Sequence, residues 1–165
     1  MTKAFWTAIV MIIICLDQIS KWLTEIFLPL QKEVEFLPLL SLYRTYNEGV
    51  AFSFLSDFGK WSLIVLTLLI IGFVFWLWRS LEADRLLTAF GYAFVIGGAF
   101  GNLIDRIWLG KVIDMFYFHI EAFNFHFAIF NVADTFITLG AIAIIIEEFT
   151  RWKNGNHSKE NTSNE

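Results

Sequence analysis

The sequence has a single cysteine, Cys15, and few charged residues. One cysteine excludes an intramolecular disulfide, and its position in an apolar run predicts an inert buried thiol. Charged residues make up only 17% of the chain, against about 25% in soluble domains, while apolar residues reach 57%. The net charge is −4, and the sequence contains no block of basic residues. We therefore expect a membrane protein without a nucleic-acid partner.

Several catalytic motifs are also missing. The sequence contains no His-Glu-x-x-His zinc motif, no Gly-x-Ser-x-Gly elbow and no phosphate-binding loop. His119 and His126 lie in a Phe-rich stretch, where they are expected to be interfacial side chains rather than metal ligands. The sequence thus predicts no metal site and no cofactor.

Four apolar runs have lengths that suit membrane spans, at about residues 4–26, 61–78, 86–106 and 131–149. A span needs about 20 residues, because a helix rises 1.5 Å per residue and the hydrocarbon core is about 30 Å thick. Gly97 and Gly101 in the third run form a small-xxx-small pair, which lets helices approach closely. Residues 1–153 are expected to form one membrane-embedded domain, followed by a disordered cytoplasmic tail at 154–165.

Two segments outside the runs alternate between apolar and polar residues. Residues 40–46 have the period of a short strand, and residues 107–130 have that of an aromatic hairpin at the membrane interface. The predicted fold is therefore an all-α polytopic membrane protein with four transmembrane helices and a small β-containing extracytoplasmic cap. The segment 30–60 is expected to form a lid or cradle.

Basic residues divide equally between the two sides of this topology, so the positive-inside rule barely decides the orientation. Setting aside Lys21 and Arg106 as possible site residues gives a weak preference for cytoplasmic termini.

Charged residues near membrane depth are candidates for function because they are costly there. Asp17 and Lys21 share one face of the first span, and Asn102, Asp105 and Arg106 share a face at the end of the third. The alternatives are a structural ion pair for the first group and an ordinary interfacial helix end for the second.

Asp114 and Asp134 each adjoin a membrane boundary on the same side. Asp134 stands in the first turn of the fourth span, where Asn131 could cap the helix. Two carboxyl groups held close together share a proton, so one can accept a proton from water while the other donates to a carbonyl group. The pair suits peptide hydrolysis, although a loop carboxylate and a helix cap are the structural alternatives.

The first of five ordered motifs is Asp17-Gln18-x-x-Lys21, and the second is the run Tyr46-Asn47-Glu48-Gly49-Val50-Ala51-Phe52. The third spans residues 97–106 and ends in Asn102-Leu103-Ile104-Asp105-Arg106. The last two are Val112-Ile113-Asp114 and Phe130-Asn131-Val132-Ala133-Asp134. Together these motifs resemble those of bacterial lipoprotein signal peptidase, the signal peptidase II family of aspartic peptidases.

The resemblance implies catalysis by Asp114 and Asp134. It also implies positioning of substrate and acids by Asn47, Asn102, Arg106 and Asn131, with support from Asp17, Lys21, Gly49 and Asp105. Members of that family remove the signal peptide from prolipoproteins just before a diacylglyceryl-modified cysteine, and they need no cofactor.

The same resemblance implies a multi-pass protein of the bacterial cytoplasmic membrane, surrounded by membrane lipids, with its active site on the extracytoplasmic side. It also implies inhibition by cyclic peptides of the globomycin type. Two alternatives come from other classes of protein. Intramembrane charges also mark a small ion- or proton-coupled transporter, and the glycine pair fits a non-catalytic assembly protein.

Overall fold

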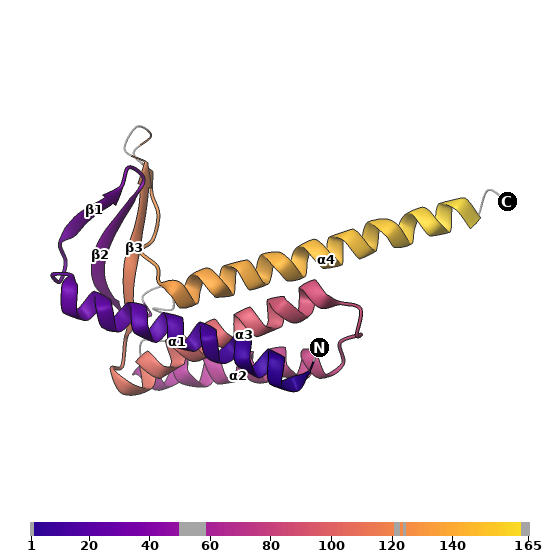
Figure 1. Ribbon diagram of the computed structural model, residues 1–165, viewed down its shortest axis with the longest axis horizontal. Coiled ribbons are helices and arrows are strands. Elements are labelled where there is room, and N and C mark those ends of the chain that lie inside the picture. The colour runs from indigo at the N-terminus through magenta and orange to yellow at the C-terminus, as the bar shows by residue number, and fades with distance from the viewer. Residues whose placement is uncertain (1, 50–58, 121–122, 124, 163–165) are drawn as a thin grey trace.

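The computed structural model describes residues 2–49, 59–120, 123 and 125–162. These residues form α1 (Lys3–Phe27), β1 (Glu33–Leu37), β2 (Leu40–Asn47), α2 (Gly59–Arg79), α3 (Leu86–Trp108), β3 (Val112–Ile120), β4 (Phe125–His126) and α4 (Val132–Thr162). The helices run side by side, and the sheet stands across one end of them (Figure 1). Both chain termini lie at the other end.

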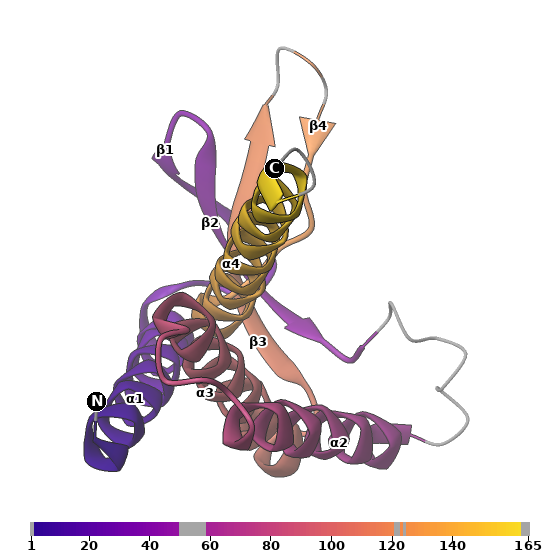
Figure 2. The same cartoon turned by 90° about the vertical axis from the view of Figure 1, so that its right-hand side faces the viewer.

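Helix α3 lies at the centre of the helical layer, where it packs against α1, α2 and α4 (Figure 2). Ile64 and Ile71 of α2 pack against Ala99 and Leu103 of α3 in one buried apolar cluster. By contrast, α1 and α2 expose many large apolar side chains on their outer faces. Exposed apolar surface on this scale suits contact with lipid rather than water. Cys15 is also exposed on α1, so the prediction of a buried thiol is wrong.

Glycines let α3 approach its neighbours closely. A methyl group added to Gly97 would lie 2.9 Å from Cβ of Ile13 on α1, and one added to Gly101 would lie 2.5 Å from Oδ2 of Asp17. The prediction that Gly97 and Gly101 serve close helix packing is therefore confirmed, and their partner is α1. On a neighbouring face of α3, Gly98 touches the backbone of α4 in the same way.

Gly98→Ala should separate α3 from α4, because the new methyl group would overlap the carbonyl oxygen of Ala133. Overpacking of this kind costs about 1–3 kcal/mol. We expect a lower melting temperature in detergent. Gly72→Ala on α2 is the matched control, because no atom lies within 4 Å of its added methyl group. Equal stability of the two variants would contradict the close contact.

Among the residues that the structure describes, three helices are long and apolar enough to cross a membrane by length and composition, at Lys3–Phe27, Trp61–Arg79 and Leu86–Trp108. Their bounds agree with three of the four apolar runs in the sequence. In α4 only residues 135–146 separate Asp134 from Glu147. This uncharged stretch is about 18 Å long at 1.5 Å per residue. It is shorter than the hydrocarbon core of about 30 Å, so α4 is not among the helices that are apolar enough to cross a membrane.

Helix α4 also continues past the predicted end of the fourth span, as far as Thr162. The backbone of residues 154–162 is therefore helical, where a disordered tail is predicted. No proline interrupts this segment, and each residue added to an existing helix gains a hydrogen bond without a new nucleation cost.

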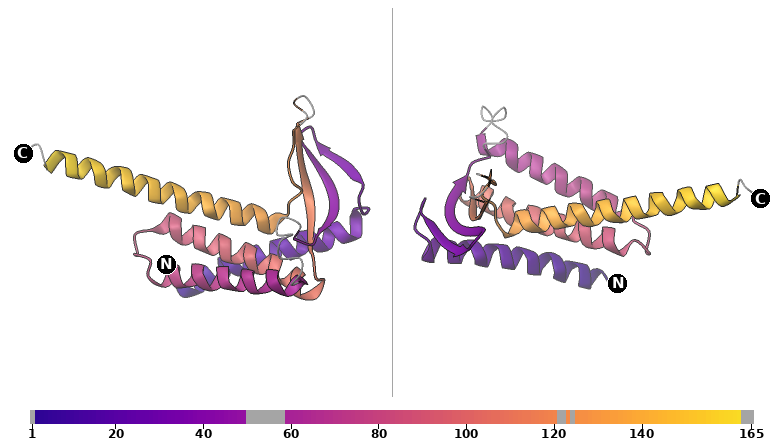
Figure 3. Two further views of the ribbon diagram at one scale, coloured as in Figure 1. Left: turned by 180° about the vertical axis from the view of Figure 1, so that it is seen from behind. Right: turned by 90° about the horizontal axis from the view of Figure 1, so that it is seen from above.

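The four strands form one antiparallel sheet in the order β1-β2-β3-β4. Strand β2 confirms the strand predicted at residues 40–46. The predicted hairpin corresponds to β3 and β4, although α3 occupies its first residues as far as Trp108. The structure adds β1, which the sequence did not predict. Seen from behind and from above, the sheet stands at the end of the helices where α4 begins (Figure 3), and β3 contacts α1 and α3. Residues 50–58 of the predicted lid lie outside the described residues.

Candidate active site

The polar residues singled out in the sequence come together where the sheet meets the helices. Helix α1 contributes Asp17 and Lys21, and the last turns of α3 contribute Asn102, Asp105 and Arg106. The remaining residues are Asn47 at the end of β2, Gly49 just after it, Asp114 on β3, and Asn131 and Asp134 at the start of α4. Five elements distant in the sequence thus build one polar cluster.

Lys21 is the centre of the buried part of this cluster. Its Nζ lies 2.7 Å from Oδ2 of Asp17 and 2.8 Å from Oδ2 of Asp105, and it donates to Oδ1 of Asn102 at 3.0 Å. All four residues are almost fully buried. Lys21 therefore connects α1 to α3 and positions Asn102. A structural ion pair with Asp17 alone, the alternative considered from the sequence, does not account for these further contacts.

Gln18 was not among the predicted site residues, yet it supports the same cluster. Its Nε2 donates to Oδ1 of Asp105 at 2.9 Å and to the carbonyl oxygen of Gly101 at 3.1 Å. Backbone groups contribute as well. The N–H of Ala133 donates to Asp17 at 2.9 Å, and the N–H of Ile113 donates to Asp105 at 3.2 Å. These bonds fix the starts of α4 and β3 against the other helices.

Asp114 is a buried carboxyl group with hydrogen-bond donors on both oxygens. Asn47 donates from Nδ2 to Oδ2 at 3.0 Å, and Asn131 donates from Nδ2 to Oδ1 at 2.7 Å. Only 1% of Asp114 is exposed. Burial and the negative charge of Asp134 raise the pKa of Asp114 from 3.8 to about 6. Near neutral pH this carboxyl group can therefore hold a proton that an exposed Asp would have lost.

Asp134 is half-buried and lies in the first turn of α4. It accepts hydrogen bonds from Nδ2 of Asn102 at 2.8 Å and from the backbone N–H of Asn131 at 3.3 Å. Oδ1 of Asn131 accepts from the N–H of Asp134 at 2.9 Å. The predicted helix cap is thus confirmed, and a helix N-terminus favours a negative charge.

Asn131 connects the two acids. Its side-chain oxygen Oδ1 caps α4. Its Nδ2 donates to Asp114 and also to Oδ1 of Asn102 at 3.1 Å. Asn131 is completely buried, so these contacts hold it in one orientation. Asp114 and Asp134 are consequently fixed on either side of a single side chain.

Asn47 is oriented by the turn that follows β2. The backbone N–H of Gly49 donates to Oδ1 of Asn47 at 2.9 Å, which leaves the Nδ2 donor facing Asp114. Gly49 has a φ of 86°, a conformation that residues with a side chain rarely adopt. Gly49 therefore forms the turn that orients Asn47 towards Asp114.

Arg106 is half-buried beside the acids, and Asp134, Asp105 and Asp114 are close enough for their charges to act on it. Within the part of the chain that the structure describes, its guanidinium group makes no hydrogen bond and no ion pair. Unlike the ammonium group of Lys21, which has three partners, the guanidinium group of Arg106 has no partner among the described residues.

The two histidines of the Phe-rich stretch have partners in the sheet. His119 is buried, with Nε2 3.0 Å from Oγ of Ser41, while Nδ1 of His126 lies 2.7 Å from the hydroxyl oxygen of Tyr117. Across residues 2–49, 59–120, 123 and 125–162, no three His, Cys, Asp or Glu side chains are grouped to hold a metal ion.

The sequence matches the family described as signal peptidase (SPase) II over residues 9–150. The chain belongs to the signal peptidase II family. Among its relatives, the lipoprotein signal peptidase of Bartonella bacilliformis is 53% identical over 142 residues, covering 86% of this chain and 85% of the relative. That of Sinorhizobium fredii is 47% identical over 144 residues, covering 87% and 86% of the two chains.

Solved structures show the same fold. One, described as a bacterial membrane enzyme, superimposes with a TM-score of 0.78 at 27% identity and covers 92% of each chain. A second structure with the same description has a TM-score of 0.76 at 27% identity. Membership of the signal peptidase II family supports a peptidase rather than the transporter or the assembly protein.

Arg106→Lys should impair cleavage by a member of this family, because the planar guanidinium fork can bind a carboxylate or carbonyl oxygen from two directions and an ammonium group cannot. We expect a loss of at least tenfold in kcat/KM with a lipidated substrate. Arg85→Lys is the control, since Arg85 pairs with Glu148 at the distant end of the helices. Equal tolerance at both positions would return Arg106 to the role of an interfacial anchor.

Proposed function

We propose that this protein removes signal peptides from prolipoproteins by aspartic catalysis, with Asp114 and Asp134 as the catalytic pair. The observation that carries the proposal is the double contact of Asn131, which donates to Asp114 at 2.7 Å and to Asp134 at 3.3 Å. Asn131 thus contacts two carboxyl groups, one of which is buried. Such a pair shares one proton.

The different environments of the two acids support different roles for them. Asp134, which is half-buried at the start of α4, acts as the base and takes a proton from the attacking water. Asp114, with its raised pKa, carries the shared proton and donates it to the oxygen of the scissile carbonyl group. Water oxygen bonds to the carbonyl carbon, giving a tetrahedral diol.

Collapse of the diol reverses the proton flow. A carboxyl group protonates the peptide nitrogen, the C–N bond breaks, and the other carboxylate accepts a proton from the diol. The products are a free carboxyl group on the signal peptide and an amino group on the lipoprotein. The pair ends the cycle with one proton, so neither a metal nor a covalent intermediate is required.

Asn102 and Asn131 position the acids, while Arg106 offers donors to the substrate backbone. Lys21 donates to Asn102 and is itself held by Asp17 and Asp105. We propose a substrate with a diacylglyceryl group on the cysteine after the scissile bond. Its acyl chains can remain in the bilayer, because the cluster lies where the sheet meets the apolar helices (Figure 1).

The decisive experiment incubates the purified protein with a synthetic prolipoprotein and identifies the products by mass spectrometry. We expect a new N-terminus at the diacylglyceryl cysteine and no cleavage of the unlipidated substrate. A globomycin-type cyclic peptide should inhibit competitively. Cleavage at another bond, or equal cleavage without the lipid, would contradict the proposed specificity.

For the topology, we propose that α4 is the fourth span, that both termini are cytoplasmic, and that the sheet and the acids face the opposite side. Helix α4 packs along the central α3, and the acids Glu147 and Glu148 would lie near the head groups at its far end. The charged loop before α3 contacts this end of α4 through two ion pairs. Arg85 of the loop pairs with Glu148, and Asp84 of the loop pairs with Arg151.

Labelling of single cysteines tests this orientation. In a Cys15→Ala background, Glu35→Cys in β1 and Lys153→Cys in α4 both place a thiol at an exposed position. An impermeant maleimide added to intact spheroplasts should label position 35 only. Labelling of both positions from outside would contradict a fourth crossing, and labelling of position 153 alone would reverse the orientation.

A further inference from the structure

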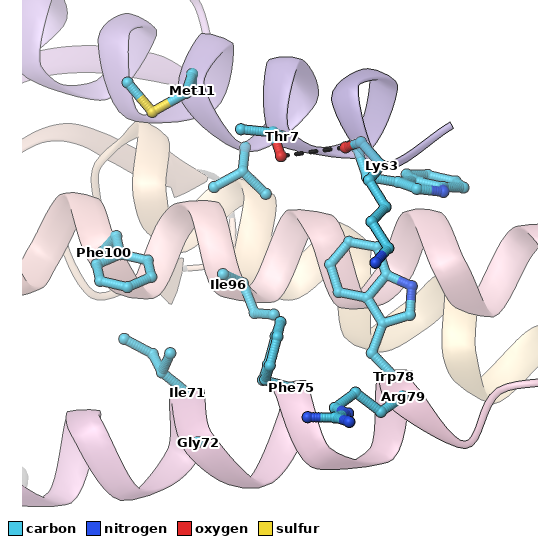
Figure 4. Close-up of a pocket in the computed structure, with 12 residues that line it drawn as sticks. Lys3, Thr7, Met11, Ile71, Gly72, Phe75, Trp78, Arg79, Ile96 and Phe100 are labelled. Carbon is cyan, nitrogen blue, oxygen red and sulfur yellow. Dashed lines mark hydrogen bonds between the residues drawn. The ribbon is translucent and has the colours of Figure 1, made fainter. Parts of the chain in front are cut away.

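An apolar groove opens on the lipid-facing side of the helices, at the end that carries the N-terminus. It runs between α1 and α2, has a volume of about 920 Å³, and has Ile96 and Phe100 of α3 as its floor (Figure 4). Met11 and Phe75 line the two walls. Small-molecule sites have volumes of about 300–1,000 Å³, so the groove is large enough for a ligand.

Two cations stand at the mouth of the groove. Lys3 begins α1 and Arg79 ends α2, and both side chains are directed into the opening (Figure 4). Both are exposed, and over the described ranges neither has an ion pair. No acidic residue lines the groove. The mouth of the groove therefore carries a local positive charge, and the rest of the groove is largely apolar.

The dimensions suit one leaflet of a bilayer. Lys3 to Met11 on α1, and Ile71 to Arg79 on α2, each cover eight helical steps, or about 12 Å along the helix. Half of a hydrocarbon core is about 15 Å thick. The rings of Trp6 and Trp78 meet edge-on at the charged end, with centroids 5.6 Å apart. Tryptophans prefer this depth, at the boundary between acyl chains and head groups.

We propose that this groove binds an anionic phospholipid, with the phosphate between Lys3 and Arg79 and one acyl chain along Ile96 and Phe100. Charge complementarity selects this occupant. The charged end of a signal peptide is positive, so Lys3 and Arg79 would repel it. A symmetric second copy would bring the same two cations against each other. The site is distinct from the catalytic cluster, because Asp17 lies fourteen residues beyond Lys3 on α1, about 21 Å along the helix.

Native mass spectrometry of the delipidated protein with dioleoyl phosphatidylglycerol or dioleoyl phosphatidylcholine tests the proposal. We expect the wild type to retain phosphatidylglycerol preferentially. Each basic residue near anionic lipid contributes about fivefold in affinity, so Lys3→Gln with Arg79→Gln should weaken binding about 30-fold. Lys153→Gln is the matched control, since Lys153 is an exposed cation outside the groove. Equal retention of the two lipids by the wild type, or an equal loss in the control, would overturn the proposal.

Gly72→Phe tests the groove itself. No atom lies within 4 Å of the Cβ position of Gly72, so a Phe ring can fill the channel without displacing the backbone. We expect loss of phosphatidylglycerol binding at least tenfold, with an unchanged melting temperature after delipidation. Full retention of the lipid would show that it binds elsewhere. If Gly72→Phe instead raised KM for the prolipoprotein while lipid retention stayed constant, the groove would belong to the signal peptide.

Discussion

Asp114→Asn and Asp134→Asn should each reduce cleavage of a lipidated prolipoprotein by about a thousandfold or more. General acid–base catalysis contributes about 10²–10⁴-fold for each group, and Asn has the shape of Asp without its exchangeable proton. Both variants should insert and fold, because Asn131 and Asn102 still find an oxygen atom to bind. Single-turnover rates measured by mass spectrometry, with circular dichroism for folding, provide the comparison.

The double variant should be scarcely slower than either single variant, since residues that act as one unit are not additive. Asp84→Asn is the control. Asp84 is an exposed acid that pairs with Arg151 at 2.5 Å at the far end of the helices. Substantial turnover by either catalytic variant would contradict the aspartic mechanism, as would additive losses in the double variant.

The pH dependence of the wild type follows from the same pair. The pKa of Asp114 is raised to about 6, so its proton is present below that pH and is lost as the pH rises through it. If Asp114 donates this proton, kcat/KM should fall on the alkaline side, beginning near pH 6. A second proton on the pair at low pH removes the general base, which gives a bell-shaped profile. Its two apparent values belong to the pair. A flat profile from pH 5 to 9 would contradict proton sharing.

The sequence singled out the residues that form the polar cluster, but not the contacts between them. Intramembrane charges and the five ordered motifs located Asp114, Asp134 and their asparagine partners without a structure. Nothing in the sequence indicated that Asn131 would both cap α4 and donate to Asp114. Gln18 stands in the first motif, but its contact with Gly101 and that of the Ala133 N–H with Asp17 were missed, because a contact across more than 80 residues leaves no local pattern.

The elements were predicted where one physical signal dominates. Long apolar runs identified α1, α2 and α3, and strict alternation identified β2. Strand β1 was missed although residues 33–36 alternate between Glu and apolar residues, because this pattern is only four residues long. All five residues of β1 are exposed. Helix α4 was misjudged at its C-terminal end, since the loss of apolar residues after Trp152 does not itself break a helix.

Lys21→Met should be the most destabilising of the substitutions considered. Lys21 is 2% exposed and pairs with Asp17 at 2.7 Å and with Asp105 at 2.8 Å. Removing one partner of a buried ion pair costs about 3–5 kcal/mol, because the remaining charge is left uncompensated. Activity should fall as well, because Asn102 loses the donor that orients it towards Asp134. Thermal unfolding in detergent and the cleavage assay measure the two effects.

A second substitution separates charge from packing. Adding Asp17→Asn to Lys21→Met removes one of the uncompensated anions, while the amide oxygen can still accept from the N–H of Ala133. The double variant should therefore be more stable than Lys21→Met alone and remain poorly active, because Asn102 is still unsupported. Lys153→Met, at an exposed position of α4, should change neither quantity. If Asp17→Asn destabilised the Lys21→Met protein further, the carboxylate would contribute through hydrogen bonds rather than through the ion pair, and the cluster would not depend on charge balance.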